Sequence, residues 1–301
     1  MRSFTQAGWV VTAADLAPNI GYIRRFGRAD CPIHSVDVTD AGMVRALFDH
    51  AGVCDAVVFA AGLTGQRTQT DPSLATDILL KGTESIAAAM RATGIPRLVG
   101  VSSLAVYATG RNSSEPLCEA ENPTGQVGVY GSVIRRMEAA MIALEGLSVG
   151  LARAAGVYGP NRYGHGSQSS QLIERLLYSA ALKQPINLQG YWQDCDDFIY
   201  ARDLGDALEG LARPGHPEGC EIINVGTGTT ASLRELIEAI EQSIGPIDVN
   251  LVAPDPPRAP LARPPLDTAR MLKRIGPPKF TLKEAMRDFA REVDLLIAQE
   301  A

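Results

Sequence analysis

Polar side chains that could bind or react with a ligand stand where predicted strands end and helices begin. The apolar run at Trp9–Ala14 is followed by Asp15, and the run at Leu98–Ser102 is followed by Ser103. In open α/β sheets, ligands bind at the carboxyl ends of the strands, so these two side chains are expected to face a ligand crevice. A serine at a strand end can instead bond its own backbone, and an aspartate there is common in any loop. Tyr130, at the start of a predicted helix, is a third candidate, with a packing role as the alternative.

A glycine-rich turn offers a different chemistry, the binding of a dinucleotide phosphate. Gly226, Gly228 and Ala231 form a Gly-x-Gly-x-x-Ala pattern between a predicted strand and a predicted helix, and Asp248 follows Gly228 by twenty residues. Such a pattern can present backbone N–H groups and a helix N-terminus to a phosphate. The alternative is an ordinary tight turn into a helix.

Strand-like runs alternate with helical segments through the first two thirds of the chain, which predicts βαβ units and a parallel sheet. Beyond residue 158 the alternation becomes irregular, and Ala253–Pro265 must be an extended, proline-rich loop. The further predicted strands are His34–Val38, Ala56–Ala61, Ser148–Ala154 and Ile222–Val225. The predicted helices are Met43–His50, Asp71–Thr93, Tyr130–Leu144, Ser232–Ile244, Asp267–Ile275 and Leu282–Ile297.

Composition and charge narrow the class of protein. The 301 residues are 46% hydrophobic and 21% charged, as in ordinary globular chains. A net charge of -6 argues against nucleic acid or an anionic membrane as the main partner. The sequence has no apolar run of the roughly 20 residues that span a bilayer, and no recognisable secretory signal. Five scattered cysteines and four histidines without ligand spacing indicate a cytoplasmic protein with reduced thiols and no metal site.

Five motifs in a fixed order carry a family resemblance. They are VSSLAVY at Val101–Tyr107, VYGSVIRRME at Val129–Glu138, GVYGPN at Gly156–Asn161, DFIYARDL at Asp197–Leu204 and NVGTGT at Asn224–Thr229. In this order and spacing they resemble the landmarks of the extended short-chain dehydrogenase/reductases of the NAD-dependent epimerase/dehydratase type. The resemblance runs from about Gly8 to the C-terminus, and it is specific only because the five motifs occur together.

The resemblance implies a Rossmann-like, doubly wound parallel α/β sheet with a smaller mixed α/β C-terminal part that binds the substrate. We expect residues 1–158 to form the NAD-binding domain and residues 159–301 mostly the substrate-binding part, with some segments returning to the first. The implied reaction is hydride transfer to or from a nicotinamide ring on a sugar-like or nucleotide-sugar substrate. Ser103 matches the residue that holds the substrate hydroxyl. Tyr130 matches the general acid/base, which also contacts the cofactor.

The cofactor implied by the resemblance is NAD. Asp15 matches the acid that binds the adenosine ribose hydroxyls and repels the 2′-phosphate of NADP. Asp37 and Val38 resemble the pair that brackets the adenine ring. A small-residue turn that lets the cofactor lie close to the backbone is matched by three consecutive residues, Ala60, Ala61 and Gly62.

The sequence departs from the family pattern at its first residues. The family opens with a buried strand, a Gly-x-x-Gly-x-x-Gly turn and a helix, in roughly 30 residues before the ribose-binding acid. Here fourteen residues precede Asp15, and Met1–Ala7 can supply only the end of that helix. We therefore expect a break in the middle of the sheet and weak binding of NAD. The preferred explanation is an incomplete or mis-started sequence, and the alternative is a truncated, non-catalytic homologue.

A second departure removes the cation that activates the tyrosine in the family. There, a Tyr-x-x-x-Lys spacing places both side chains on one helix face, about 40° apart, and the ammonium lowers the tyrosine pKa. Here the fourth residue after Tyr130 is Ile134, and Arg135 lies about 140° around the helix from Tyr130. Tyr130 should therefore keep a pKa near the free value of about 10, and acid/base catalysis near neutrality should be slow.

A third departure concerns the substrate. Nucleotide-sugar enzymes commonly carry Arg-Asp before the Phe-Ile/Val-Tyr run, and the arginine contacts phosphate. This chain has Asp196 and Asp197 there. Arg258 and Arg263 in the proline-rich loop could bind an anion instead, with solvated loop charges as the alternative. Asn161 is a further candidate for the substrate side.

Two hypotheses for the function remain. The first is an NAD-dependent oxidoreductase or epimerase, favoured by the retained Ser103 and Tyr130. The second is a non-catalytic family member that binds a ligand or partner through the same cleft, favoured by Ile134 and the absent glycine loop. The motif order places the Gly226 turn in the substrate half, which favours a tight turn there. In the family, two long helices often pair into a four-helix bundle, and the helices at 71–93 and 130–144 are the candidates for such a homodimer here.

Overall fold

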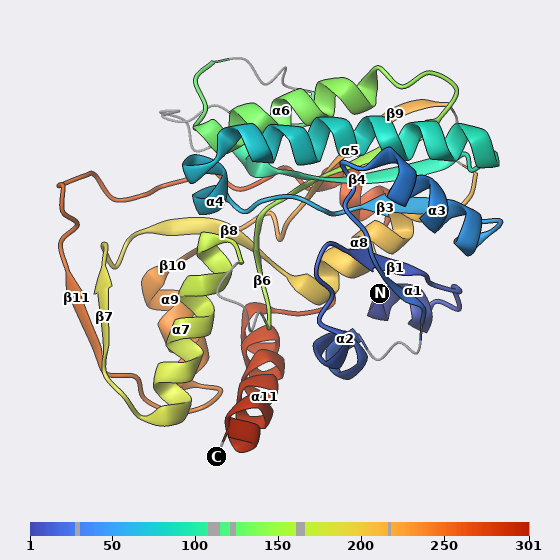
Figure 1. The fold of residues 1–301 in the computed structure, drawn as a ribbon. Helices are drawn as coiled ribbons and strands as arrows, with labels where there is room; N and C mark the ends of the chain where they lie inside the picture. The colour runs from blue at the N-terminus through green and yellow to red at the C-terminus, as the bar shows by residue number, and fades with distance from the viewer. Residues whose placement is uncertain (28–30, 108–114, 121–124, 161–165, 216–217, 301) are drawn as a thin grey trace.

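The computed structural model describes residues 1–27, 31–107, 115–120, 125–160, 166–215 and 218–300 (Figure 1). Two parallel sheets form the Rossmann-like part. The larger has the order β3 (Ala56–Phe59), β4 (Arg97–Ser103), β5 (Ser148–Ala154) and β9 (Gly219–Val225), and the smaller pairs β1 (Ala13–Asp15) with β2 (Ile33–Ser35). Among the described strands β1 and β3 do not pair, so the predicted break in the sheet is observed.

Helices cover both faces of the larger sheet, as a doubly wound fold requires (Figure 1). One face carries α5 (Pro72–Thr93) and α6 (Val129–Ile142), and α8 (Ala201–Ala212) packs on the other. The predicted stop of α5 is confirmed, because Gly94 has a left-handed φ of 73°. The remaining helices of this part are α1 (Arg2–Gln6), α2 (Ile20–Gly27), α3 (Ala41–Ala51), α4 (Gly65–Thr70) and α10 (Ala269–Arg274), with a 3-10 turn η1 (Leu104–Val106).

The C-terminal part is smaller and mixed, as predicted (Figure 1). Three strands, β10 (Thr230–Ser232), β8 (Cys195–Tyr200) and β6 (Gly156–Tyr158), form one sheet with both antiparallel and parallel pairs, and β7 (Ile186–Gln189) pairs with β11 (Val249–Val252). Three helices pack with them: α7 (Gln168–Leu182), α9 (Leu233–Glu241) and α11 (Leu282–Glu300). The helix α9 begins directly after Ser232, the first residue of the predicted helix, where Ser232 and Glu235 form a capping box.

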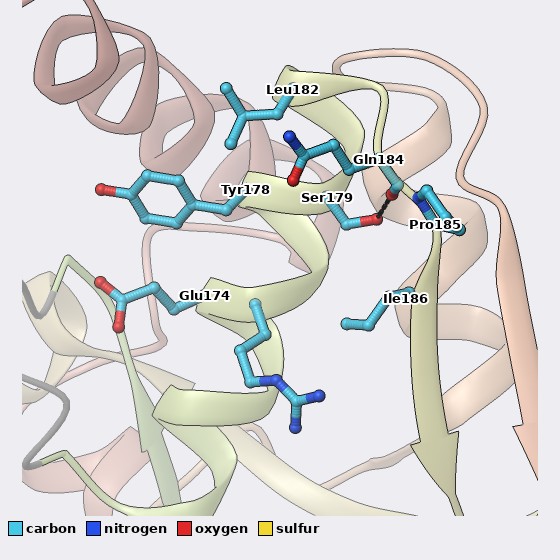
Figure 2. A pocket seen from close by; sticks show the side chains of 8 residues that line it. Glu174, Tyr178, Ser179, Leu182, Gln184, Pro185 and Ile186 are labelled. Atoms are coloured by element: carbon cyan, nitrogen blue, oxygen red, sulfur yellow. Dashed lines mark hydrogen bonds between the residues drawn. The ribbon is translucent and has the colours of Figure 1, made fainter. Parts of the chain in front are cut away.

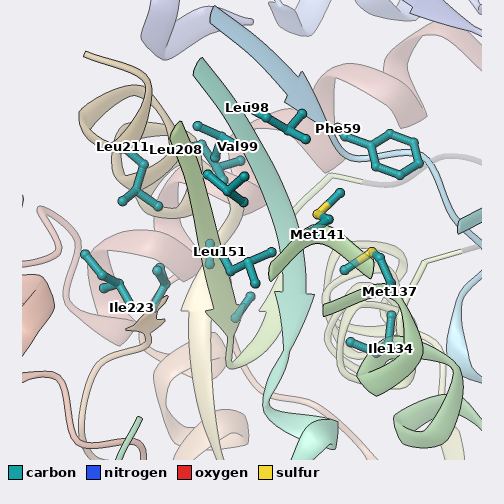
Figure 3. Packing of buried hydrophobic residues seen from close by; sticks show 14 of the residues in the cluster. Phe59, Leu98, Val99, Ile134, Met137, Met141, Leu151, Leu208, Leu211 and Ile223 are labelled. Atoms are coloured by element: carbon teal, nitrogen blue, oxygen red, sulfur yellow. The ribbon is translucent and has the colours of Figure 1, made fainter. Parts of the chain in front are cut away.

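Each of the two parts has its own cluster of buried hydrophobic side chains. In the first, strand side chains such as Leu98 and Leu151 lie between Met137 and Met141 of α6 and Leu211 of α8 (Figure 3). All five are fully buried, and burial of each such side chain stabilises the fold by about 1.5–3 kcal/mol. The second cluster joins α7, α9 and α11. Because α8, β9 and α10 contribute to the first cluster, segments after residue 159 return to the Rossmann-like part. The domain boundary at residue 158 stays a prediction.

The strand expected at Trp9–Ala14 is wrong in extent, because β1 begins only at Ala13. Gly8 makes a turn with a φ of 87°. The Trp9 indole then packs edge-on against Phe4, at 5.6 Å between ring centroids, and donates to Glu209 of α8 at 3.0 Å. The segment therefore fastens α1 to α8 instead of joining the sheet.

Candidate active site

The hydroxyls of Ser103 and Tyr130 meet at the carboxyl end of β4. Ser103 is the last residue of β4, and Tyr130 is the second residue of α6. Burial raises the pKa of Tyr130, and a hydrogen bond with the Ser103 hydroxyl partly offsets this shift. The Ser103 Oγ also accepts the N–H of Ala105 at 3.2 Å, so the serine caps its own backbone as well. The backbone contact is the alternative that the sequence offered for Ser103, and its role toward a substrate hydroxyl stays a prediction.

A glycine allows the two hydroxyls to approach. A Cβ on Gly131 would overlap the carbonyl oxygen of Ala105 in η1, the turn that follows Ser103. The first turn of α6 can therefore lie directly on η1 only because position 131 lacks a side chain. A Cβ on Gly65, at the start of α4, would lie 4.0 Å from the Tyr130 ring, so α4 borders the same site.

The position of the family lysine is part of the core. Ile134 is 4% exposed and packs beside Met137 (Figure 3). Arg135 turns toward η1 and donates to the carbonyl oxygens of Val106 and Gly125, each at 2.8 Å. Within the described ranges no cation shifts the Tyr130 pKa. The pKa therefore lies above the free value that the sequence predicts, because burial acts without a compensating charge.

The expected cofactor residues follow the ends of β1, β2 and β3. Asp15 is exposed, and its carboxylate accepts the N–H of Ala17 at 2.8 Å. Asp37 accepts the N–H and hydroxyl of Thr39 at 2.9 and 2.7 Å, which lowers the Asp37 pKa. Val38 packs against the first cluster. After β3 comes an exposed run of three small residues, Ala60, Ala61 and Gly62. An exposed carboxylate at Asp15 and small exposed residues at 60–62 are compatible with the adenosine half of NAD, and their cofactor role stays a prediction.

The glycine pattern near the end of β9 does not offer free amides to a phosphate. Asp197 is completely buried, and its carboxylate accepts the N–H groups of Thr227 at 3.0 Å, Gly228 at 3.2 Å and Leu266 at 3.1 Å. A Cβ on Gly226 would lie 2.8 Å from the same carboxylate. The turn therefore binds an anion of the chain itself, and it serves as a structural tight turn.

The two candidate arginines of the proline-rich loop are ion-paired. Arg258 donates to both carboxylate oxygens of Asp194, at 2.9 and 2.6 Å, and this pairing lowers the Asp194 pKa to about 2. Arg263 donates to Asp196 at 2.9 Å. The acidic residue in place of the family arginine therefore holds an arginine from a later loop. Asn161 lies outside the described residues.

Sequence reasoning missed a buried polar network directly beside Ser103. The carboxylate of Glu138 on α6 accepts two N–H groups of Arg153 on β5, each at 2.9 Å, and the hydroxyl of Ser102 at 2.5 Å. Arg153 also donates to Tyr107 at 3.2 Å, and the Tyr107 hydroxyl donates to Asn224 at 2.7 Å. The signal was a single charge inside an otherwise apolar predicted strand, which is rare unless the charge is paired.

Two cavities lie away from the expected site. One of about 470 Å³ opens between α7 and β7 and is lined by Glu174, Tyr178 and Gln184, among others (Figure 2). Another of about 380 Å³ lies between α1, α8 and residues 274–279. None of the expected site residues lines either. The parts of the chain with a described structure contain no cluster of three potential metal-ligating side chains, and no helix there is long and apolar enough to cross a membrane.

Comparison with known proteins agrees with this architecture. A model of the NAD dependent epimerase/dehydratase family matches residues 1–226. The chain belongs to this family. The resemblance carried by the five motifs is thereby confirmed, and the expectation of an NAD-dependent enzyme of the extended short-chain type agrees with it.

Among curated epimerase/dehydratase relatives, a UDP-glucose 4-epimerase of Mycolicibacterium smegmatis is 30% identical over 266 residues, 83% of this chain and 79% of that protein. A UDP-glucuronate 4-epimerase of Thermodesulfobacterium geofontis is 26% identical over 70% of this chain, and the match spans 64% of that protein. The solved UDP-glucose 4-epimerase of Thermotoga maritima with UDP-glucose superposes with a TM-score of 0.82 at 18% identity, covering 98% of this chain and 94% of that one. The corresponding enzyme of Thermus thermophilus with NAD gives 0.78 at 22% identity, covering 97% and 93%. These two structures support the predicted fold class.

Proposed function

We propose that this epimerase/dehydratase family member is an NAD-dependent enzyme that oxidises and re-reduces a hydroxyl-bearing carbon of a nucleotide sugar. The hydroxyl pair of Ser103 and Tyr130 at the carboxyl end of β4 is the observation that carries the proposal. The relatives named as epimerases of UDP-glucose and UDP-glucuronate support the substrate class.

The residues divide the chemistry between them. The Ser103 hydroxyl holds the reacting oxygen of the sugar, and the Tyr130 oxygen takes the hydroxyl proton as the carbon becomes a carbonyl, then returns it on re-reduction. NAD, when bound, accepts and returns the hydride. Asp15 and Asp37 would hold its adenosine, and Ala60–Gly62 would give it room. Because the Tyr130 pKa is raised, little phenolate forms near neutrality, and turnover should increase as the pH rises toward the pKa.

Arg258 and Arg263 are proposed to bind the substrate diphosphate. A guanidinium has five N–H donors, so pairing with one aspartate leaves others for a phosphate. The two side chains keep 43% and 34% of their surface exposed. Asn161 is proposed for the substrate side on its sequence position alone.

A second candidate function, binding without catalysis, is favoured by the buried Ile134. The chain then binds a nucleotide sugar in the cleft and does not turn it over. The distinguishing experiment incubates the protein with NAD and UDP-galactose over a range of alkaline pH and separates UDP-glucose by chromatography. We expect Tyr130→Phe to lower the rate by about 10²–10⁴-fold, and Tyr178→Phe in the α7 cavity to leave it unchanged. Binding of UDP-galactose by calorimetry with no product at any pH would favour the second function.

Binding of NAD by this chain is proposed to be weak. The amides of the Gly226 turn are engaged by Asp197, and β1 and β3 do not pair with each other in the described structure. The loss of two charge-assisted hydrogen bonds to a diphosphate, at about 1.5–3 kcal/mol each, corresponds to binding that is at least a hundredfold weaker. Calorimetric titration should therefore give a Kd of roughly 100 μM or higher. A Kd of about 1 μM would contradict the proposal.

A homodimer through α5 and α6 is proposed as the assembly. Leu74 of α5 and Val129 and Ile142 of α6 are 43%, 45% and 49% exposed, which is high for large apolar side chains. Light scattering on the purified chain should give twice the monomer mass of 32.1 kDa. Ile142→Asp should shift it to the monomer.

A further inference from the structure

Arg135 connects the two segments that carry the reacting hydroxyls. Its Nε donates to the carbonyl oxygen of Val106, three residues after Ser103. Its Nη1 donates to the carbonyl oxygen of Gly125, five residues before Tyr130. One side chain on α6 therefore binds the turn that leaves β4 and the loop that enters α6.

This double contact lies next to the closest approach of the two segments. In the same turn η1, the carbonyl oxygen of Ala105 faces Gly131, where no side chain can fit. Gly131 permits η1 and α6 to touch, and Arg135 supplies the attraction that holds them together. A displacement of about 1 Å between two reacting groups can lower the rate a hundredfold. The separation of η1 from α6 sets the distance between Ser103 and Tyr130, so a contact that fixes this separation can affect the rate.

An arginine side chain is better suited to this double contact than a lysine side chain. The planar guanidinium presents several N–H groups in a fixed geometry, so it can bridge two carbonyl oxygens at once. A lysine ammonium is a single point of charge on a flexible stem, and it would hold one carbonyl well. The neighbouring Arg136 makes a different contact. Its Nη1 donates to the hydroxyl of Thr76 on α5 at 3.4 Å, in an exposed position.

We infer that Arg135 is a positioning residue that holds Tyr130 within hydrogen-bonding distance of Ser103. The inference rests on the proposed function, because it gives a catalytic purpose to that pair. It assigns the Arg135 guanidinium to the backbone of η1 and of the α6 entry loop, while position 134 next to Tyr130 on the helix face holds an isoleucine.

The test compares Arg135→Gln with Arg135→Lys and with Arg136→Gln as the matched control. Arg135→Gln and Arg136→Gln each remove one positive charge from adjacent positions of α6, but only the first removes the bridge. The tyrosine is titrated by its absorbance near 295 nm, as the difference between each variant and the same variant carrying Tyr130→Phe. Turnover of UDP-galactose with NAD is measured on the same proteins, and circular dichroism checks that each is folded.

We expect Arg135→Gln to raise the Tyr130 titration midpoint, because the hydrogen bond from Ser103 that lowers it is weakened. It should also lower kcat roughly tenfold to a hundredfold with little change in KM. Arg136→Gln should stay near the parent protein in both. Arg135→Lys keeps the charge but should restore only part of the midpoint and of kcat. If Arg135→Gln is unfolded, the test rests on Arg135→Lys alone. A titration midpoint and a kcat equal to those of the parent protein in that variant would overturn the inference.

The possible failures can be told apart. Equal midpoints for Arg135→Gln and Arg136→Gln, or full recovery in Arg135→Lys, would mean that only charge matters, which overturns the inference. If the parent protein turns over no nucleotide sugar at any pH, the proposed function fails. The titration still decides whether Arg135 holds Tyr130 beside Ser103, because it needs no substrate.

Discussion

The two ends of the proposed cleft rest on very different parts of the sheet. At the catalytic end, β4 pairs with β3 on one side and with β5 over seven residues on the other, and every residue of β5 is buried. At the adenosine end, β1 pairs with β2 over three residues, and no residue of β1 is buried. Ser103 and Tyr130 accordingly stand on a rigid core, whereas Asp15 stands on an exposed pair of short strands.

This difference indicates what a strand needs in order to present a reactive group. Helices cover both faces of the larger sheet, so the polar side chains of a central strand such as β5 are buried and must be paired, as Arg153 is with Glu138 of α6. Those pairs tie the strand to the helix above it and thereby position the residue at its end. A short strand with one neighbour has fewer such constraints, and the carboxylate at its end is exposed and accepts a local N–H, that of Ala17.

The largest expected effect is on the free energy of unfolding, which should fall far more for a substitution at the catalytic end than for one at the adenosine end. Arg153→Ala leaves the buried Glu138 carboxylate without its ion-pair partner, and it should lower the free energy of unfolding by about 3–5 kcal/mol. Asp15→Ala should change it by about 0.5 kcal/mol or less, since Asp15 is exposed. Urea denaturation of both variants measures this. A loss below about 1 kcal/mol for Arg153→Ala would mean that the buried network does not set the rigidity of the catalytic end.

The next largest effect is expected from a side chain added at Gly131, where α6 contacts η1. Gly131→Ala places a Cβ on the carbonyl oxygen of Ala105, and it should cost about 1–3 kcal/mol of stability as α6 shifts away from η1. Turnover should fall with it. Gly128→Ala is the control, because a Cβ there has no neighbour within 4 Å. Thermal denaturation that does not distinguish the two variants would count against the close approach.

The acid/base behaviour of Tyr130 responds to a charge placed at position 134. Burial raises the Tyr130 pKa, so the folded protein binds the phenol proton more tightly than the unfolded chain does. The stability linked to this proton is fully present below about pH 10, the pKa of a free tyrosine, and is lost as the pH rises through the pKa of the folded state. Ile134→Lys puts an ammonium on the same helix face and should lower the titration midpoint by about 1–2 pH units. The turnover profile should shift to lower pH by the same amount. An unmoved midpoint in a folded variant would mean that the ammonium points elsewhere.

The smallest effect concerns the loop that borders the substrate part. Pairing with Arg258 lowers the Asp194 pKa to about 2, so its stabilising contribution is present above about pH 4 and is lost as the pH falls through 2. Arg258 is 43% exposed, so Arg258→Gln should cost about 0.5–1 kcal/mol at neutral pH and almost nothing at pH 2. Urea denaturation at both pH values measures the difference. A cost that does not depend on pH would show that the ion pair is not its source.

Much of the fold followed from the order of apolar runs. The strand at Ser148–Ala154 has the predicted limits, and α9 begins directly after Ser232 as predicted, because local signals, a continuous apolar run and a capping box, set them. The end of α9 was wrong by three residues, since the helix stops at Glu241 and not at Ile244. The strand expected from Trp9 was wrong because its indole finds a partner on α8, two hundred residues away in the sequence. No local pattern encodes that contact.

The sequence by itself determined the family, the alternation of strands and helices, the absence of the lysine beside Tyr130 and the break between β1 and β3. These follow from residue type and order along the chain. Only the tertiary structure decided that Arg135 binds η1, that Asp197 occupies the Gly226 turn, and that Arg153 and Glu138 neutralise one another. Each of these depends on which polar groups meet when water is excluded, and distance along the chain does not fix that.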